Sequence, residues 1–421
     1  MNYEPEVISR IKQGRSKFIA MASAYFLGAF NDNFFKQAAM LMAVVAGNSA
    51  LQGKATILFS LPFILFSAYS GWMADRFSKR KVIIGAKLLE LIAMIIGAYG
   101  IISVNWNCIL AMIFIMGLQS AIFGPALNGS IPELYPEIYV GHANAVVKFV
   151  STAAILAGIS LAGIVLDKKG DFGGADLGQV LVAAVILLVA LLGVLVSFGV
   201  NKREPVGTSV SFPFTGPLDS ILEFFAIRKD PALFLAIIGD AFFYFLSLLA
   251  VLHINTFGLI QLGLTRTMTS LLTVSLMIGI CAGSFLAARI VAKKPWSSVL
   301  FPSSLGLGIG LILTFTTPMM PESVRQIFLF LFLFITGACG GVFLIPVTSF
   351  IQIRPSPDSK GRIISVSNFC SFSAMLIAGQ VFIFMDNCLS PSANIGVLGI
   401  FSVIASFCFL AIRKRKEINH V

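Results

Sequence analysis

Residues 71–81 read GWMADRFSKRK, and this polar stretch separates two long apolar runs of the chain. A glycine and one acidic residue come first, and four of the last six positions are basic. The apolar runs on both sides approach the roughly 20 residues that a helix needs to cross a bilayer. The stretch therefore predicts a tight exit from one membrane helix and a basic turn into the next.

The composition of the whole chain extends this prediction. Hydrophobic residues make up 57% of the 421 positions and charged residues only 12%, whereas soluble domains have about 25% charged residues. We expect an all-α integral membrane protein, because no short alternating segments typical of a β-barrel occur. Twelve membrane-spanning helices are predicted, at about 18–46, 55–74, 82–103, 108–131, 142–166, 176–199, 231–257, 267–292, 298–317, 326–351, 362–386 and 392–412.

The distribution of the basic residues predicts the orientation. With both termini cytoplasmic, 22 Lys and Arg residues fall on the inner side, 5 in outer loops and 3 within spans. Such an excess on one side is the positive-inside pattern of a cell inner membrane. The net charge of +11 is thereby attributed to topology and to attraction by anionic lipid, and we expect no nucleic-acid partner.

The longest polar stretch divides the chain into two halves. We expect an N-terminal six-helix bundle at 1–200, a cytoplasmic linker at 201–230 and a C-terminal six-helix bundle at 231–421. Within the linker, apolar and charged residues alternate from position 218 to 229, which predicts a short helix at the membrane interface or, alternatively, a solvated linker.

The two halves repeat several features. Asp-x-Phe-Phe occurs at 32–35 and again at 240–243, 208 positions later. Weaker echoes relate residues 71–81 to 283–294 and residues 141–154 to 361–374. Parallel repeats of this kind predict a transporter whose two bundles alternate in exposing a polar cavity to either side of the membrane.

Ionisable residues inside spans are the candidate binding residues, since they survive in a membrane by facing a bundle interior or a wet cavity. Asp32 and Lys36 share one face of the first span and can neutralise each other; alternatively, Asp32 and Asn33 offer oxygen ligands to a coupling cation, or Asp32 offers its carboxylate to a proton. Asp240 has no comparable neighbouring cation and is the stronger candidate to carry a proton.

Three further charged residues lie within spans. Lys87 and Glu90 are three positions apart and can pair, so they are candidates either for a structural ion pair or for the binding site. Lys148 has no acid within a helical turn, and we expect it to meet Asp32, Asp240 or Glu90 across the bundle, or a substrate anion. His253 is expected to reach the interface or to be hydrogen-bonded rather than to bind a ligand.

The basic turn at 71–81, with twelve spans and a long central linker, resembles the signature loop of the major facilitator superfamily. The resemblance implies the major facilitator fold over the whole chain. It also implies that Gly71, Asp75 and Arg76 belong to a cytoplasmic gate and do not bind the substrate.

Two other stretches narrow the resemblance. Residues 28–36, GAFNDNFFK, and residues 124–134, GPALNGSIPEL, are similar to the lysophospholipid transporters found beside or fused to 2-acylglycerophosphoethanolamine acyltransferase. The resemblance implies cation-coupled symport that flips a lysophospholipid to the inner leaflet, where a partner acyltransferase reacylates it. The coupling cation is H⁺ or Na⁺, and Asp32 and Asn33 would contact it or the head group.

Other classes of function are weighed against this one. No nucleophile triad, metal cluster or phosphate loop is evident, so neither an enzyme nor a metal site is predicted. The six cysteines are expected to pack as small apolar residues, with a Cys108–Cys388 bridge as a remote alternative. The alternative function is proton-coupled import or export of a soluble solute, such as a metal chelate or a drug.

Overall fold

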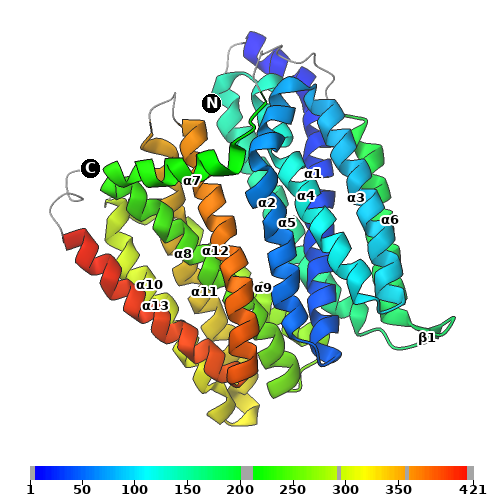
Figure 1. The fold of residues 1–421 in the computed structure, drawn as a ribbon, viewed down its shortest axis with the longest axis vertical. Helices are drawn as coiled ribbons and strands as arrows, with labels where there is room; N and C mark the ends of the chain where they lie inside the picture. The colour runs from blue at the N-terminus through cyan, green and yellow to red at the C-terminus, as the bar shows by residue number, and fades with distance from the viewer. Residues whose placement is uncertain (1–4, 201–211, 292–294, 356–359, 415–421) are drawn as a thin grey trace. The chain divides into compact units, whose positions relative to one another are not determined.

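The computed structural model describes residues 5–200, 212–291, 295–355 and 360–414. Helices account for nearly all of these residues (Figure 1). The first half contains α1 (Pro5–Val45), α2 (Ala50–Arg76), α3 (Lys79–Ile102), α4 (Trp106–Leu134), α5 (Glu137–Leu166) and α6 (Leu177–Ser197). The rest contains α7 (Gly216–Ala226), α8 (Pro231–Thr256), α9 (Arg266–Val291), α10 (Leu300–Thr316), α11 (Glu322–Ile353), α12 (Lys360–Cys388) and α13 (Pro391–Lys414).

Short elements join some of the helices. An antiparallel pair of two-residue strands, β1 (Asp171–Phe172) and β2 (Ala175–Asp176), connects α5 to α6. Gly173 and Gly174 form its turn with positive φ angles of 64° and 85°, a conformation that glycine adopts without strain. Four single turns complete the set: η1 (Ile227–Lys229), η2 (Phe257–Gln261), η3 (Trp296–Val299) and η4 (Thr317–Met319).

Among the described residues, 11 helices are long and apolar enough to cross a membrane. They match eleven of the twelve predicted spans, and the remaining predicted span, 18–46, falls on α1 except for its last residue. Helix α1 is long enough, but Asn31, Asp32, Asn33 and Lys36 interrupt its apolar character. Because a helix satisfies its own backbone hydrogen bonds, this architecture is suited to lipid, and the predicted all-α class is confirmed.

Polar side chains define where several helices begin. Asn105 accepts hydrogen bonds from the first backbone N–H groups of α4, and Asp176 does the same for α6. Asp230 caps α8 by accepting from the N–H of Leu233, and Pro231 occupies the first helical position. Each cap supplies a partner for an N–H group that the helix itself leaves unbonded.

The chain divides into two compact units, and each is considered by itself. One unit comprises residues 1–39 and 61–217, and the other comprises residues 40–60 and 218–421. The hairpin at 40–60 thus packs with the second unit, although the sequence places it among the first six helices. The expected bundle limits, 1–200 and 231–421, and the linker limits stay predictions.

Small residues bring helices together within each unit. In the first, α3 lies beside α4 and α6 (Figure 1). In the second, Gly279 and Gly283 of α9 face Gly337 and Gly341 of α11, and a Cβ at Gly283 would overlap the carbonyl oxygen of Ala338. Glycines four apart allow such backbone contact between membrane helices.

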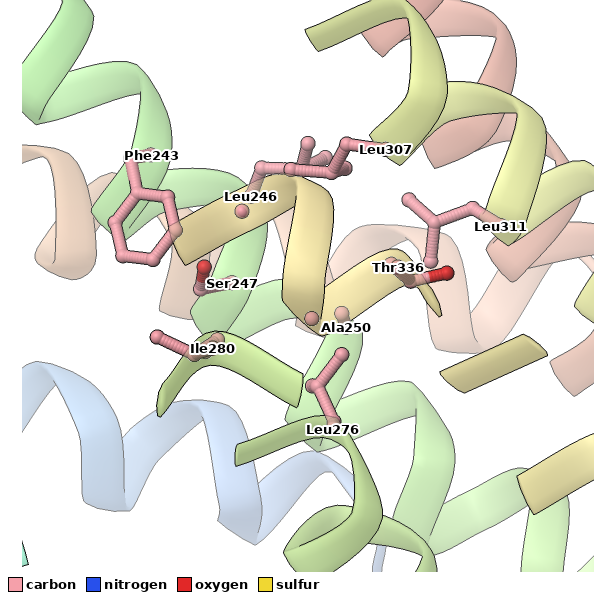
Figure 2. A pocket seen from close by; sticks show the side chains of 11 residues that line it. Phe243, Leu246, Ser247, Ala250, Leu276, Ile280, Leu307, Leu311 and Thr336 are labelled. Carbon is pink, nitrogen blue, oxygen red and sulfur yellow. The ribbon is translucent and has the colours of Figure 1, made fainter. Parts of the chain in front are cut away.

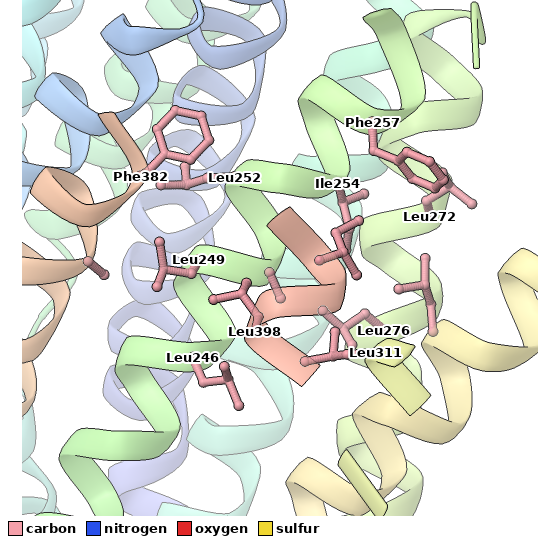
Figure 3. Close-up of a cluster of buried hydrophobic side chains, with 14 of the residues drawn as sticks. Leu246, Leu249, Leu252, Ile254, Phe257, Leu272, Leu276, Leu311, Phe382 and Leu398 are labelled. Atoms are coloured by element: carbon pink, nitrogen blue, oxygen red, sulfur yellow. The ribbon is translucent and has the colours of Figure 1, made fainter. Parts of the chain in front are cut away.

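Apolar side chains fill the space between the helices of the second unit. Figure 3 shows a buried cluster in which Leu246 and Leu249 of α8 pack with Leu276, Leu311 and Leu398. These leucines come from α8, α9, α10 and α13, so one continuous apolar core fixes helices that are far apart in the sequence.

The predicted linker helix is present as α7. It begins where Gly216 packs against Ala68, and Glu223 forms an ion pair of 3.2 Å with Arg362 of α12. Leu218, Leu222 and Phe225 are exposed, and Leu222 has 60% of its side chain accessible. The helix prediction is confirmed for this segment, whereas residues 201–211 of the linker lie outside the described residues.

Candidate functional site

Asp32 lies in the middle of α1 and is held by a hydrogen bond from a distant helix. Ser120 of α4 donates to its Oδ2 over 2.8 Å. Lys36, one turn further along α1, interacts electrostatically with the carboxylate. The second oxygen, Oδ1, is buried and has no hydrogen-bond partner among the described residues. This arrangement leaves one carboxylate oxygen free to accept from a proton donor or to coordinate a cation.

Asn33 differs from its neighbour in how its side chain is used. Its amide donates to the carbonyl oxygen of Ala29 over 2.7 Å, one turn back along the same helix. The amide nitrogen thus binds the helix backbone. The side-chain oxygen of Asn33 is the atom that could coordinate a cation, as the sequence predicts.

Lys87 and Glu90 form a sealed ion pair inside the first unit. Lys87 Nζ lies 2.6 Å from Glu90 Oε2, and both side chains are 0% exposed. The ammonium also lies 5.0 Å from the centre of the Phe123 ring, at a distance typical of a cation–π contact. The pairing expected from their spacing is confirmed, and the complete burial favours the structural alternative. Their role in binding stays a prediction.

Asn31 extends this pair into a network that joins three helices. Its Nδ2 donates to Glu90 Oε1 and to the carbonyl oxygen of Ile186, each over 3.2 Å. Gly28, one turn earlier on α1, makes room for the lysine, because a Cβ there would lie 2.6 Å from Lys87 Nζ. Helices α1, α3 and α6 are thereby fixed around one buried charge pair.

Asp240 is the counterpart of Asp32 in the second unit, and it is buried. Ser371 and Ser367, one turn apart on α12, donate to its Oδ2 over 2.7 Å and 3.2 Å. Oδ1 is again buried without a hydrogen-bond partner among the described residues. No ion pair to Asp240 occurs within the described part of the chain, in keeping with the absence of a neighbouring cation in the sequence.

Lys148 lies on α5 and is exposed, and its predicted place in the lining of a cavity stays a prediction, because a side chain that lines an open cavity is also exposed. Of the three acids expected to meet it, Glu90 is occupied by Lys87 and Asn31. In the described ranges no ion pair joins Lys148 to Asp32, the other of these acids in the first unit. The expected partner is therefore not found within this unit, and contact with Asp240 or with a substrate anion stays a prediction.

The predicted gate lies at the end of α2. Gly71 and Arg76 belong to this helix, which ends at Arg76, and α3 begins at Lys79 with Ser78 as its N-cap. Arg76 is exposed, while the side chain of Asp75 lies outside the described residues. Arg80 donates to the carbonyl oxygen of Phe198 over 2.7 Å and so ties this turn to the end of α6. The tight basic turn is confirmed, and its role as a gate stays a prediction.

His253 is fully buried, which corrects the expectation that it reaches the interface or is hydrogen-bonded. Its ring lies 4.8 Å from that of Phe382, and neither ring nitrogen has a hydrogen-bond partner in the described residues. Ile254 of α8 and Phe257, just beyond the helix, belong to the buried apolar cluster of the second unit, which keeps this end of the helix inside that unit. Nearby in sequence, Asn255 donates to Gln52 of α2 over 2.9 Å.

A small cavity opens among α8, α9, α10 and α11. Figure 2 shows Phe243, Leu246, Leu276 and Leu307 around it, with Ser247 among the few polar groups. Its volume is about 10 Å³, which is enough for about one water molecule. It is too small to hold an organic substrate.

Sequence reasoning missed four residues of these sites: Asn31, Ser120, Ser367 and Ser371. Asn31 and Ser120 lie in apolar helices, and no spacing rule connects them to partners 59 and 88 positions away. Ser367 and Ser371 are four positions apart and so share one face of α12, but no spacing rule connects this face to Asp240, 127 and 131 positions away.

Comparisons with known proteins bear on the whole chain. The sequence model described as Major Facilitator Superfamily matches residues 18–379. The chain is 26% identical over 390 residues to the lysophospholipid transporter LplT of Enterobacter sp. (strain 638), covering 90% of this chain and 91% of that protein. It is 27% identical over 373 residues to LplT of Klebsiella pneumoniae (strain 342), covering 85% and 86%.

Solved structures agree on the architecture. A D-xylose-proton symporter superimposes with a TM-score of 0.74 at 14% identity, covering 94% of this chain and 96% of that one. The inward open conformation of the xylose transporter XylE from E. coli gives a TM-score of 0.71 at 16% identity, covering 96% and 99%. At these identities the likeness shows the fold alone.

Proposed function

Because the chain belongs to the Major Facilitator Superfamily, we propose that it is a secondary transporter that moves a lysophospholipid across the inner membrane. The protein is a multi-pass membrane transporter and not an enzyme. The observation that carries the cargo assignment is the similarity, over 85–90% of the chain, to proteins named lysophospholipid transporter.

Cation coupling is the second part of the proposal. In Asp32 and in Asp240, one carboxylate oxygen accepts hydrogen bonds from serine hydroxyls. The other oxygen is buried and has no hydrogen-bond partner among the described residues. A buried, unsatisfied acceptor is costly, and a bound H⁺ or Na⁺ would remove that cost. We assign the coupling cation to one of these two acids, with Asn33 as a further oxygen donor beside Asp32.

The proposed orientation places the gate and the delivered lipid at the cytoplasmic side of the membrane. Both termini are cytoplasmic, the gate of Asp75 and Arg76 faces the cytoplasm, and the two bundles alternate in opening. A lysophospholipid delivered to the inner leaflet needs a second acyl chain, so an acyltransferase is the expected partner. Cargo and cation drive this cycle only if each binds the two open states with different affinity.

The test is transport by the purified protein in proteoliposomes, with lysophosphatidylethanolamine as cargo and with Na⁺ and pH gradients imposed separately. Wild-type protein should move the lipid, and either Asp32→Asn or Asp240→Asn should abolish the response to the gradient. Asparagine has nearly the same size and shape as aspartate, so each variant removes the negative charge without changing the volume of the side chain.

Two results would redirect the proposal. If folded wild-type protein moves no lipid under either gradient, the cargo assignment fails and proton-coupled transport of a soluble solute replaces it. If lipid moves equally well in both variants, neither acid carries the coupling cation.

A further inference from the structure

A groove between α1 and α5 of the first unit has features that the binding residues above do not explain. The two helices touch backbone to backbone near Gly158 of α5, where a Cβ would lie 2.7 Å from the carbonyl oxygen of Phe30. Towards the start of each helix they separate, and two adjoining cavities of about 360 Å³ and 410 Å³ lie between them. Both volumes are in the range of ligand pockets, about 300–1,000 Å³.

The cavity nearer Gly158 is apolar. Its lining comes from α1 and α5, and Ser23 is its one polar member; the set is Phe18, Ile19, Ala22, Ser23, Phe26, Val146 and Val150. Ile19 has 54% of its side chain accessible, so the cavity is open along its side. It is therefore suited to an apolar chain that enters through this open side.

The outer cavity combines cations with aromatic rings. Lys12 and Arg15, three apart on α1, line it and are exposed. Tyr135, Tyr139 and His142 line the opposite side, and consecutive rings lie 4.9 Å apart. Burial and the nearby Tyr139 raise the pKa of Tyr135, while Arg15 opposes this, so the hydroxyl of Tyr135 is neutral at physiological pH.

The two cavities form one groove, because Phe18, Ile19 and Val146 line both. Within the described residues, neither Lys12 nor Arg15 is engaged in an ion pair; the side chains of the neighbouring Glu133 and Glu137 lie outside that set. Basic side chains at one end and an apolar trough at the other are complementary to a phosphate with one acyl chain.

We propose that the α1–α5 groove binds a lysophospholipid, with its phosphate at Lys12 and Arg15 and its acyl chain between Phe18 and Val150. The choice of a single-chain lipid rests on the proposed function. In the proposed orientation the basic end lies at the inner face of the membrane, so the groove would hold the lipid where it reaches the inner leaflet.

The experiment uses full-length protein in detergent micelles and a lysophosphatidylglycerol with a diazirine on its acyl chain. Mass spectrometry of the irradiated protein should place the label on residues 18–26 and 146–150. The double variant Lys12→Gln/Arg15→Gln should need about tenfold more lipid for half-maximal labelling, because two charge-assisted contacts are lost. The matched control, Lys168→Gln/Lys169→Gln, changes the charge equally in an exposed loop and should leave labelling unchanged.

A second variant tests the apolar trough independently. Val146→Trp fills the space shared by both cavities and should block labelling, while its gel-filtration profile shows whether it remains folded. Excess inorganic phosphate should fail to displace the lipid, because it lacks the chain. Diacyl phosphatidylglycerol should compete at least tenfold more weakly than unlabelled lysophosphatidylglycerol.

Two outcomes would overturn the groove proposal. Label outside the groove, or labelling unaffected by either groove variant, would exclude this site. Equal competition by the diacyl lipid would show that the groove holds ordinary membrane phospholipid. Transport failure with correct groove labelling would instead refute the proposed function, so the two hypotheses fail separately.

Discussion

The buried pair of Lys87 and Glu90 permits a quantitative test of whether these residues stabilise the fold. Both side chains are 0% exposed, so removing one leaves the other as a buried charge without its partner, which costs about 3–5 kcal/mol. For a unit of this size, each kcal/mol corresponds to roughly 2 °C, so Lys87→Met and Glu90→Gln should each lower the melting temperature by roughly 6–10 °C.

The double variant Lys87→Met/Glu90→Gln should recover about half of the loss that either single variant causes. Neither charge remains, and the glutamine oxygen can still accept from Asn31, so the cost should be about 1–3 kcal/mol for amide hydrogens that lack an acceptor. The coupling between the two changes is then large, as expected for residues in direct contact.

The assay is thermal unfolding of the purified variants in detergent, followed by their transport activity in liposomes. Lys148→Met is the matched control, because the same substitution at an exposed lysine should shift melting by only about 1 °C. Single variants that melt like the wild type but lose transport would refute the structural reasoning and return the pair to the binding site.

Three other predictions concern packing, coupling and orientation. Gly283→Val should cost about 3 kcal/mol or more in detergent unfolding, because its side chain overlaps α11, whereas Gly85→Val, with open space around it, should cost under about 1 kcal/mol. In cation titrations of transport, Ser371→Ala should lower the half-maximal cation concentration about tenfold, because it removes a hydrogen bond that stabilises the cation-free carboxylate of Asp240, and Ser371→Thr should restore the wild-type value; no change would exclude Asp240 as the coupling acid. With the other cysteines replaced, the exposed free thiol of Cys388 should react with an impermeant maleimide from outside intact spheroplasts, and labelling only after lysis would reverse the proposed orientation.

The fold was predictable because lipid imposes a strong rule on the sequence. A spanning helix must be apolar for most of its length, so its limits follow from composition, and the basic turn at residues 71–81 marks one junction. The strand pair at 171–176 was not predicted, although its sequence DFGGAD contains the Gly-Gly turn that favours a hairpin.

The candidate site was predictable only within single helices. The spacing of Lys87 and Glu90 on one helix predicted their pairing, since residues three apart are neighbours on its surface. Asp240 was predicted as a buried acid, but its serine partners are 127 and 131 positions away. Lys148 was expected to meet an acid or a substrate anion, and which group it faces depends on how α5 is rotated, which its sequence alone does not determine.

The glycine contact between α9 and α11 has a consequence for movement. At Gly279 and Gly283 the backbones of α9 and α11 touch, and no side chain lies between them that could repack by changing rotamer. We therefore expect these two stretches to move together as one rigid unit. Pro346 lies in α11 beyond Gly341 and removes a backbone hydrogen bond there. We therefore expect α11 to bend at Pro346, in its last two turns. Such a hinge would move the end of this helix while the glycine contact with α9 stays intact.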